Sequence, residues 1–177
     1  NALTWTFSLL SRHPGVAARL REETSGVLGG RVPALEDLAR LPFNRMVVQE
    51  AMRLYPPIWI IERRVIAGDS AAGFDLPAGS AVVVAPYALH RHPGFWEAPE
   101  VFHPERFASL PPTAAYIPFG SGPRSCIGSE FAMLEAQLIC AMVSQFFRMR
   151  PVPGPPAVPD PGITLRVKDG LPMILEA

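Results

Sequence analysis

Cysteine is scarce in this sequence, with only Cys126 and Cys140 among its 177 residues. Two cysteines are too few for the disulfide framework of a small secreted domain. Neither sign of charge dominates, because Lys+Arg and Asp+Glu both number 16, and we therefore expect no nucleic-acid partner. Apolar runs long enough to cross a bilayer are also lacking. These absences favour a reducing, cytoplasmic location, although an anchor upstream of residue 1 stays open.

The remaining composition is that of a globular protein. Hydrophobic residues make up 49% of the chain and charged residues 18%, which suffices for a core in one domain or in a piece of a larger one. Lys168 is the only lysine, and this preference for arginine is typical of high-GC bacterial genes. Residues 1–10 have the pattern of a helix interior without a cap or an initiating methionine. We therefore expect the amino-terminal part of a parent protein to precede Asn1.

Apolar periodicity and helix-breaking residues predict four main helices, at residues 1–12, 16–24, 43–55 and 129–147. A loop is expected from Ser25 onward. The last helix is expected to bury an apolar stripe, which consists of Phe131, Leu134, Leu138, Met142 and Phe146. Short strands are predicted at residues 58–61, 81–85, 163–167 and 172–175. The predicted fold class is therefore mainly α with a small β-sheet, an α+β arrangement.

The segment 119–128, FGSGPRSCIG, gathers reactive and permissive residues around Cys126. This cysteine directly precedes the last predicted helix, whose unpaired N–H groups and positive dipole end favour a thiolate. Gly122 and Gly128 permit a close backbone approach that a Cβ would block. Arg124 offers a guanidinium suited to a carboxylate, and Phe119 offers an apolar wall that keeps water from the sulfur.

Five of these residues match one template at fixed spacing. The haem-binding signature of the cytochrome P450 family is Phe-x-x-Gly-x-Arg-x-Cys-x-Gly, and this sequence resembles it at every specified position. A lone cysteine is more often a small core residue, as we expect for Cys140 in mid-helix. The resemblance implies haem b, iron protoporphyrin IX, with the Cys126 sulfur as axial ligand of the iron. It also implies that residues 1–177 are the carboxy-terminal, haem-binding part of a single cytochrome P450 domain.

The resemblance extends to Glu50-Ala51-Met52-Arg53, which is similar to the family's Glu-x-x-Arg. It implies a third partner, Arg106, from the segment Pro-Glu-Arg-Phe, so that Glu50 bridges two arginines. The alternative is a solvated surface pair, which contributes only about 0.3–0.5 kcal/mol. Because the helix is apolar on both sides of the pair, we expect burial. We therefore assign these three residues to folding and haem retention, not to chemistry.

Two further residues are candidates for contacts with the haem propionates. Members of the family use an arginine at the position of Arg64, for which the alternative is a surface arginine beside Arg63. His90, near the end of a predicted strand, is the second candidate. Together with His92 it also suggests a metal site, but an isolated pair lacks the other ligands of a zinc centre.

The resemblance implies a monooxygenase that inserts one atom of O2 into a small apolar organic substrate, with electrons from a ferredoxin or a flavin reductase. Ile58, Trp59 and Ile60 are expected to line the substrate pocket or to pack in the core. No catalytic residue is assigned within this chain, because the family's acid–threonine pair would lie upstream of Asn1. Two alternatives stay open: a fragment without the oxygen-activating helix that is inactive alone and binds no haem, and a peroxide-driven haem-thiolate enzyme.

Overall fold

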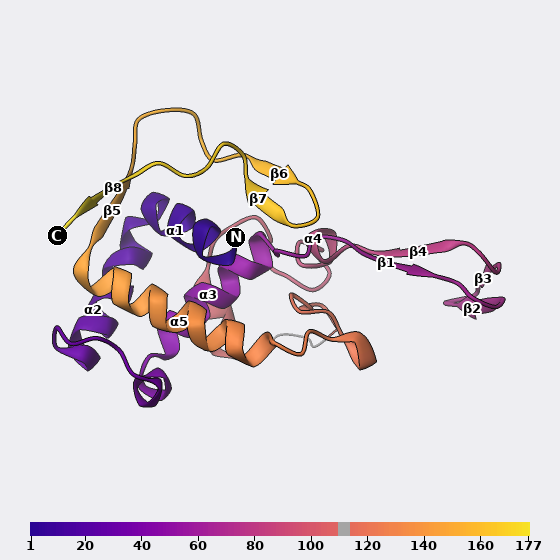
Figure 1. Ribbon diagram of the computed structural model, residues 1–177, viewed down its shortest axis with the longest axis horizontal. Coiled ribbons are helices and arrows are strands. Elements are labelled where there is room, and N and C mark those ends of the chain that lie inside the picture. Colours follow the sequence, from indigo (N-terminus) through magenta and orange to yellow (C-terminus); the bar gives the residue numbers. More distant parts are fainter. Residues whose placement is uncertain (110–113) are drawn as a thin grey trace.

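Helices form the body of the molecule in the computed structural model, which describes residues 1–109 and 114–177 (Figure 1). The α-helices of the described residues are α1 (Ala2–Arg12), α2 (Pro14–Leu28), α3 (Pro42–Leu54), α4 (Pro86–Leu89) and α5 (Ser129–Phe146). Short 3-10 helices are η1 (Leu35–Arg40), η2 (Pro104–Ala108) and η3 (Gly122–Arg124). None of these helices combines the length and apolar character that a membrane crossing requires.

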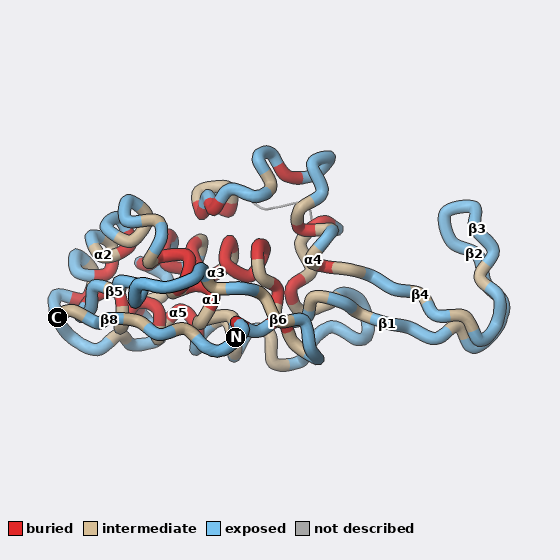
Figure 2. The backbone as a smooth tube through the Cα atoms, turned by 90° about the horizontal axis from the view of Figure 1, so that it is seen from above, coloured by how far each residue is buried: buried red, intermediate tan, exposed pale blue. Residues whose placement is uncertain are grey.

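The strands of the described residues pair in twos, always antiparallel. Strand β1 (Ile61–Arg64) pairs with β4 (Ala81–Val84), and β2 (Asp69–Ala71) pairs with β3 (Phe74–Leu76). These two hairpins form one arm that reaches away from the helices and is largely exposed (Figures 1 and 2). Near the carboxy terminus, β5 (Arg148–Pro151) pairs with β8 (Met173–Glu176), and β6 (Pro159–Pro161) with β7 (Leu165–Val167). The predicted α+β class, mainly helical with small sheets, is confirmed.

Proline and glycine set most of the helix boundaries. Pro14 and Pro42 occupy the first positions of α2 and α3, where the missing N–H needs no partner. Gly29 closes α2 in the left-handed conformation, with φ of 59°. Glu23 caps the start of α3, because its two carboxylate oxygens accept the N–H groups of Phe43 and Asn44 at 2.8 Å each.

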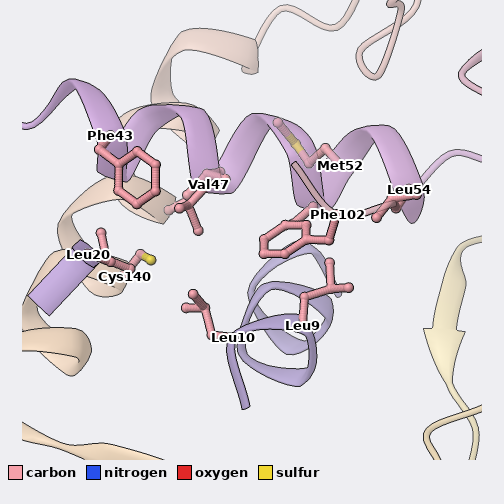
Figure 3. Packing of buried hydrophobic residues seen from close by; sticks show 12 residues of the cluster. Leu9, Leu10, Leu20, Phe43, Val47, Met52, Leu54, Phe102 and Cys140 are labelled. Carbon is pink, nitrogen blue, oxygen red and sulfur yellow. The ribbon is translucent and has the colours of Figure 1, made fainter. Parts of the chain in front are cut away.

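The main core lies where α1 and α3 face each other, with α2 and α5 closing the sides (Figure 3). Its buried members are Leu9, Leu10, Leu20, Phe43, Val47, Val48, Ala51, Met52, Leu54, Phe102, Ala136 and Cys140. Burial of each large apolar side chain contributes about 1.5–3 kcal/mol. Cys140 is fully buried here, and desolvation raises the pKa of its thiol to about 12. Cys140 is therefore a packing residue.

Two predicted boundaries were wrong. Helix α2 continues to Leu28 instead of ending near Thr24, because the buried Thr24 and Leu28 hold its last turn against the core. The first strand covers Ile61–Arg64 and not residues 58–61. Pairing with β4 decides its place, since Ile61 lies opposite Val84 and Arg64 opposite Ala81. Because β1 and β4 are largely exposed, their sequences do not alternate between apolar and polar residues, and the strand start could not be predicted from such a pattern.

The predicted buried stripe of α5 was also wrong. Phe131 is 72% exposed, and Leu134, Met142 and Phe146 are 37–38% exposed. The buried side of this helix carries smaller or polar residues instead, namely Ala136, Gln137, Cys140, Ala141, Ser144 and Gln145. Small side chains let α5 pack closely on α2 and α3, and the Asn44 amide donates to the Gln137 carbonyl at 2.9 Å. A large apolar face of α5 therefore remains uncovered.

Candidate functional site

The cysteine loop, residues 119–128, is closed by its own backbone just before α5. The N–H of Cys126 donates to the Phe119 carbonyl at 2.9 Å, and the N–H of Ser125 donates to the Gly122 carbonyl at 3.0 Å. Gly120 and Gly122 have φ of +77° and +72°, a backbone conformation that other residues rarely adopt. The loop therefore needs glycine at both positions for its turns.

The sulfur of Cys126 lies at the start of the longest helix described. Cys126 is exposed, and α5 begins three residues later and extends over 18 residues. The partial positive charge at the amino-terminal end of a helix favours an anionic sulfur nearby. Exposed apolar residues flank it, since Ile127 is fully exposed and Phe131 is 72% exposed. The site thus presents a sulfur donor beside an open apolar surface.

Gly128 borders the sulfur without crowding it. A Cβ at this position would lie 3.9 Å from Cys126 Sγ, an ordinary contact distance, so the described residues do not exclude a side chain there. At Gly122 a Cβ would meet nothing within 4 Å, and only the positive φ requires glycine. The predicted close approach of another group to the Gly122 backbone stays a prediction, since no described residue lies there. For Gly128, space is required only if a group occupies the sulfur's open side.

Arg124 and Phe119 have different surroundings. Arg124 is exposed in η3, and none of the described carboxylates pairs with its guanidinium. Phe119 is half-buried and packs against the main core cluster. Phe119 therefore anchors the loop to the helices, while Arg124 remains available for an anionic group.

The ion-pair set centres on Glu50, which is fully buried on α3. One carboxylate oxygen accepts from Arg53 Nε at 2.7 Å. The other accepts from Arg53 Nη2 at 2.8 Å, from Arg106 Nε at 3.0 Å and from the His103 backbone N–H at 3.0 Å. The structure thus brings Glu50, Arg53 and Arg106 together, and their side chains are at most 12% exposed.

The remaining donors of Arg53 bind backbone carbonyls that sequence reasoning missed. Its Nη1 donates to the carbonyls of His90 and Pro99 at 2.7 Å each, and its Nη2 donates to that of Val101 at 3.2 Å. The signal for these contacts is indirect. An irregular, proline-rich segment has no ladder of its own, so its buried carbonyls need donors from elsewhere. Arg53 supplies them and holds the segment on α3.

The two predicted propionate contacts differ in burial: Arg64 is exposed and His90 is buried. Arg64 is exposed at the end of β1, whose first residue, Ile61, lies 4.0 Å from where a Cβ on Gly120 would be. The strand therefore starts beside the cysteine loop. His90 is fully buried, and its Nε2 accepts the N–H of Ile117 at 2.9 Å. This placement does not favour a propionate contact for His90.

The segment before β1 is tied to the β6–β7 hairpin. Trp59 Nε1 donates to the Gly162 carbonyl at 2.8 Å, and the N–H of Leu165 donates to the Pro57 carbonyl at 2.8 Å. Ile58 and Ile60 are 39% and 38% exposed, so neither packs in the core. Both isoleucines therefore remain open to contact with another group.

The site thus combines an exposed cysteine in a self-closed loop before α5 with an exposed arginine in the same loop, and α3 carries a buried Glu–Arg pair. Comparison with known proteins identifies the family. The family model of cytochrome P450 matches residues 1–170. This chain belongs to the cytochrome P450 family.

Several curated relatives are similar over most of this chain. Cyclooctatin synthase of Streptomyces melanosporofaciens is 42% identical over 171 residues, which cover 93% of this chain and 37% of the relative. Cyclooctat-9-en-7-ol 5-monooxygenase of the same organism is 39% identical, covering 87% of this chain and 34% of the relative. Cytochrome P450 4A10 of Rattus norvegicus is 37% identical, covering 99% and 35%. The chain thus spans about a third of the length of these relatives, which come from both bacteria and animals.

Proposed function

We propose that the protein carrying this chain is a haem-dependent monooxygenase and that the Cys126 thiolate would hold the haem iron. The observation that carries the proposal is the exposed Cys126 sulfur, placed by a closed loop at the start of α5. When bound, haem b supplies the chemistry of O2 activation, in which one oxygen atom enters the organic substrate and the other leaves as water. Membership in the cytochrome P450 family supports this assignment.

The residues around the sulfur fit a cofactor with an apolar plane and two carboxylates. Ile127 and Phe131 form an exposed apolar surface next to Cys126. The Arg124 guanidinium, unpaired among the described residues, suits a propionate, and Arg64 is proposed as a second partner. Gly128 leaves the space beside the sulfur open. Together these residues are proposed to bind and orient the cofactor.

The role of Glu50, Arg53 and Arg106 is structural in this proposal. Their buried network holds the irregular segment around residues 97–106 against α3. The proposal assigns these residues to folding and to haem retention.

The substrate is proposed as a small apolar organic molecule that contacts Ile58 and Ile60. These isoleucines are exposed in the described residues and lie just before β1, whose start neighbours the cysteine loop. One relative is named as a monooxygenase of cyclooctat-9-en-7-ol. Electrons are proposed to come from a ferredoxin or a flavin reductase, and a cytoplasmic location remains a prediction.

We also propose that residues 1–177 form the carboxy-terminal, haem-binding part of one cytochrome P450 domain. The uncovered apolar face of α5, with Phe131, Leu134, Met142 and Phe146, supports this because such a face needs cover from further protein or cofactor. The same observation favours the alternative for the isolated chain, which is that it binds no haem and is inactive. Haem titration of the isolated chain tests this alternative. Haem uptake with a thiolate-type spectrum would contradict it.

The decisive experiment compares the two cysteines in the full-length protein. We expect Cys126→Ala to abolish the red-shifted Soret band of the reduced, carbon monoxide-bound protein, and Cys140→Ala to leave it in place because Cys140 is buried in the core. An unaltered band in the Cys126 variant refutes the proposal. Oxygen consumption with a reductase, compared with turnover on peroxide alone, separates the monooxygenase from a peroxide-driven enzyme.

A further inference from the structure

His90 links the buried ion pair to the segment that leads into the cysteine loop. It caps the carboxy-terminal end of α4 and has no exposed surface. Its backbone is held at both ends, because its carbonyl accepts from Arg53 Nη1 at 2.7 Å and its N–H donates to the Pro86 carbonyl at 2.8 Å. The Cα of His90 is therefore fixed relative to α3.

The imidazole ring of His90 contacts Tyr116 and Ile117, which precede the cysteine loop. Its Nε2 accepts the backbone N–H of Ile117 at 2.9 Å, which places the ring proton of the neutral form on Nδ1. The ring packs against Tyr116, with centroids 5.3 Å apart, and the Tyr116 hydroxyl donates to the Gln49 carbonyl at 3.0 Å. Tyr116 is thus hydrogen-bonded directly to α3, whereas Ile117 is connected to α3 through His90, whose carbonyl accepts from Arg53.

A short series of backbone bonds leads from Ile117 to the sulfur-bearing residue. The Ile117 carbonyl accepts the N–H of Gly120 at 3.0 Å, which forms the first turn of the loop. The Phe119 carbonyl then accepts the N–H of Cys126 at 2.9 Å. Both amide and carbonyl of Ile117 are therefore used, one by the His90 ring and one by the loop.

We propose that His90 is a positioning residue, whose ring Nε2 fixes the entry of the cysteine loop to the Glu50–Arg53 pair and so sets the place of the Cys126 sulfur. The geometry that carries this is the path of contacts from Arg53 through His90 and Ile117 to the loop. The inference rests on the proposed function only for the statement that the sulfur binds iron. The link between His90 and the loop stands independently of any cofactor.

The test compares substitutions that keep or remove the acceptor in the full-length protein. Glutamine carries its side-chain oxygen at about the distance of Nε2 from the Cα, whereas methionine has a similar size but only a weakly accepting sulfur. Hydrogen exchange is measured on peptides that cover residues 116–126, with a peptide from α1 as internal reference. We expect His90→Met to speed exchange in the loop peptides about tenfold, as loss of one hydrogen bond implies, and His90→Gln to stay close to wild type.

The second readout is the thiolate-type band of the reduced, carbon monoxide-bound protein. The inference expects this band to convert to a non-thiolate form several times faster in His90→Met than in His90→Gln. If His90→Met does not fold, His90→Asn replaces it, because its shorter amide does not reach Ile117.

Four outcomes are decisive. Equal exchange rates of the loop peptides in His90→Met and His90→Gln overturn the inference. An exchange rate that rises as much in the α1 peptide as in the loop peptides also overturns it. A normal band together with unchanged exchange in the acceptor-free variant sinks the inference but leaves the proposed function intact. Absence of the band in wild type refutes the proposed function, while the exchange data still decide whether His90 holds the loop.

Discussion

The buried pair of Glu50 and Arg53 offers the sharpest test of how this fold is held together. In Glu50→Gln the side chain keeps its shape and loses its charge. Arg53, whose side chain has no exposed surface, then carries a buried positive charge without a counter-ion, and Arg106 loses its partner as well. The new amide also turns a donor toward guanidinium groups that only donate.

The magnitude follows from burial. Removal of one partner from a buried ion pair costs about 3–5 kcal/mol, because the remaining charge cannot be rehydrated. The whole stability of a domain is about 5–15 kcal/mol, so this one change removes a large share. A matched exposed pair exists in the same region. Glu100, whose side chain is 72% exposed, pairs with Arg91 at 3.2 Å, and Glu100→Gln should cost at most about 1 kcal/mol.

The assay is urea unfolding of the full-length protein, followed by circular dichroism, for wild type and both variants. Comparable slopes against urea concentration would show that the difference lies in stability and not in the extent of unfolding. Added salt should leave the Glu50→Gln effect nearly unchanged, because buried charges are little screened. If the two variants lose the same stability, or if Glu50→Gln loses less than about 1 kcal/mol, the reasoning from burial is wrong.

Three further predictions use the same unfolding assay. Burial lowers the pKa of His90 to about 4, whereas an unfolded histidine has a pKa near 6.5. The contribution of His90 to stability should therefore be fully present above about pH 6.5, and stability should fall by up to about 3 kcal/mol as the pH drops toward 4. This loss should be missing in His90→Gln, and its persistence there would contradict the assignment. Gly122→Ala should cost about 1–2 kcal/mol because φ is +72°, while Gly26→Ala, inside α2, should stabilise by about 0.5–1 kcal/mol. Glu23→Gln should cost about 1 kcal/mol through the weakened cap of α3, against almost nothing for the exposed Glu22→Gln, and equal effects would speak against capping.

Local chemistry made much of the fold predictable. Pro14, Pro42 and Pro56 start or end helices because proline lacks an N–H and restricts the residue before it. The α5 helix was placed to within one residue at its end. Its buried face was not predictable. Phe131 and Met142 give the helix an apolar side, but the sequence does not indicate whether another element packs on that side. Within the described residues, close packing selected the side with Ala136 and Cys140 instead.

The candidate site divides in a similar way. The segment 119–128 specifies the loop, the cysteine and the helix that follows, since all its determinants lie within ten residues. The partners of Arg53 lie 37 to 48 residues away, on carbonyls whose residue types carry no signal. A carbonyl is common to every residue, so only the folded chain decides which ones meet a guanidinium. The same holds for His90, which resembled a cofactor contact in the sequence and lies in the structure against the amide of Ile117.

The sequence by itself therefore determined the class of the site, because the spacing of glycine, arginine and cysteine before a helix is a local property of the chain. Tertiary structure alone decided which α5 face is buried, where β1 begins, and how the loop is held through His90 to Glu50 and Arg53. These depend on contacts between distant segments, whose free energy comes from burial and hydrogen bonding that appear only once the chain has folded.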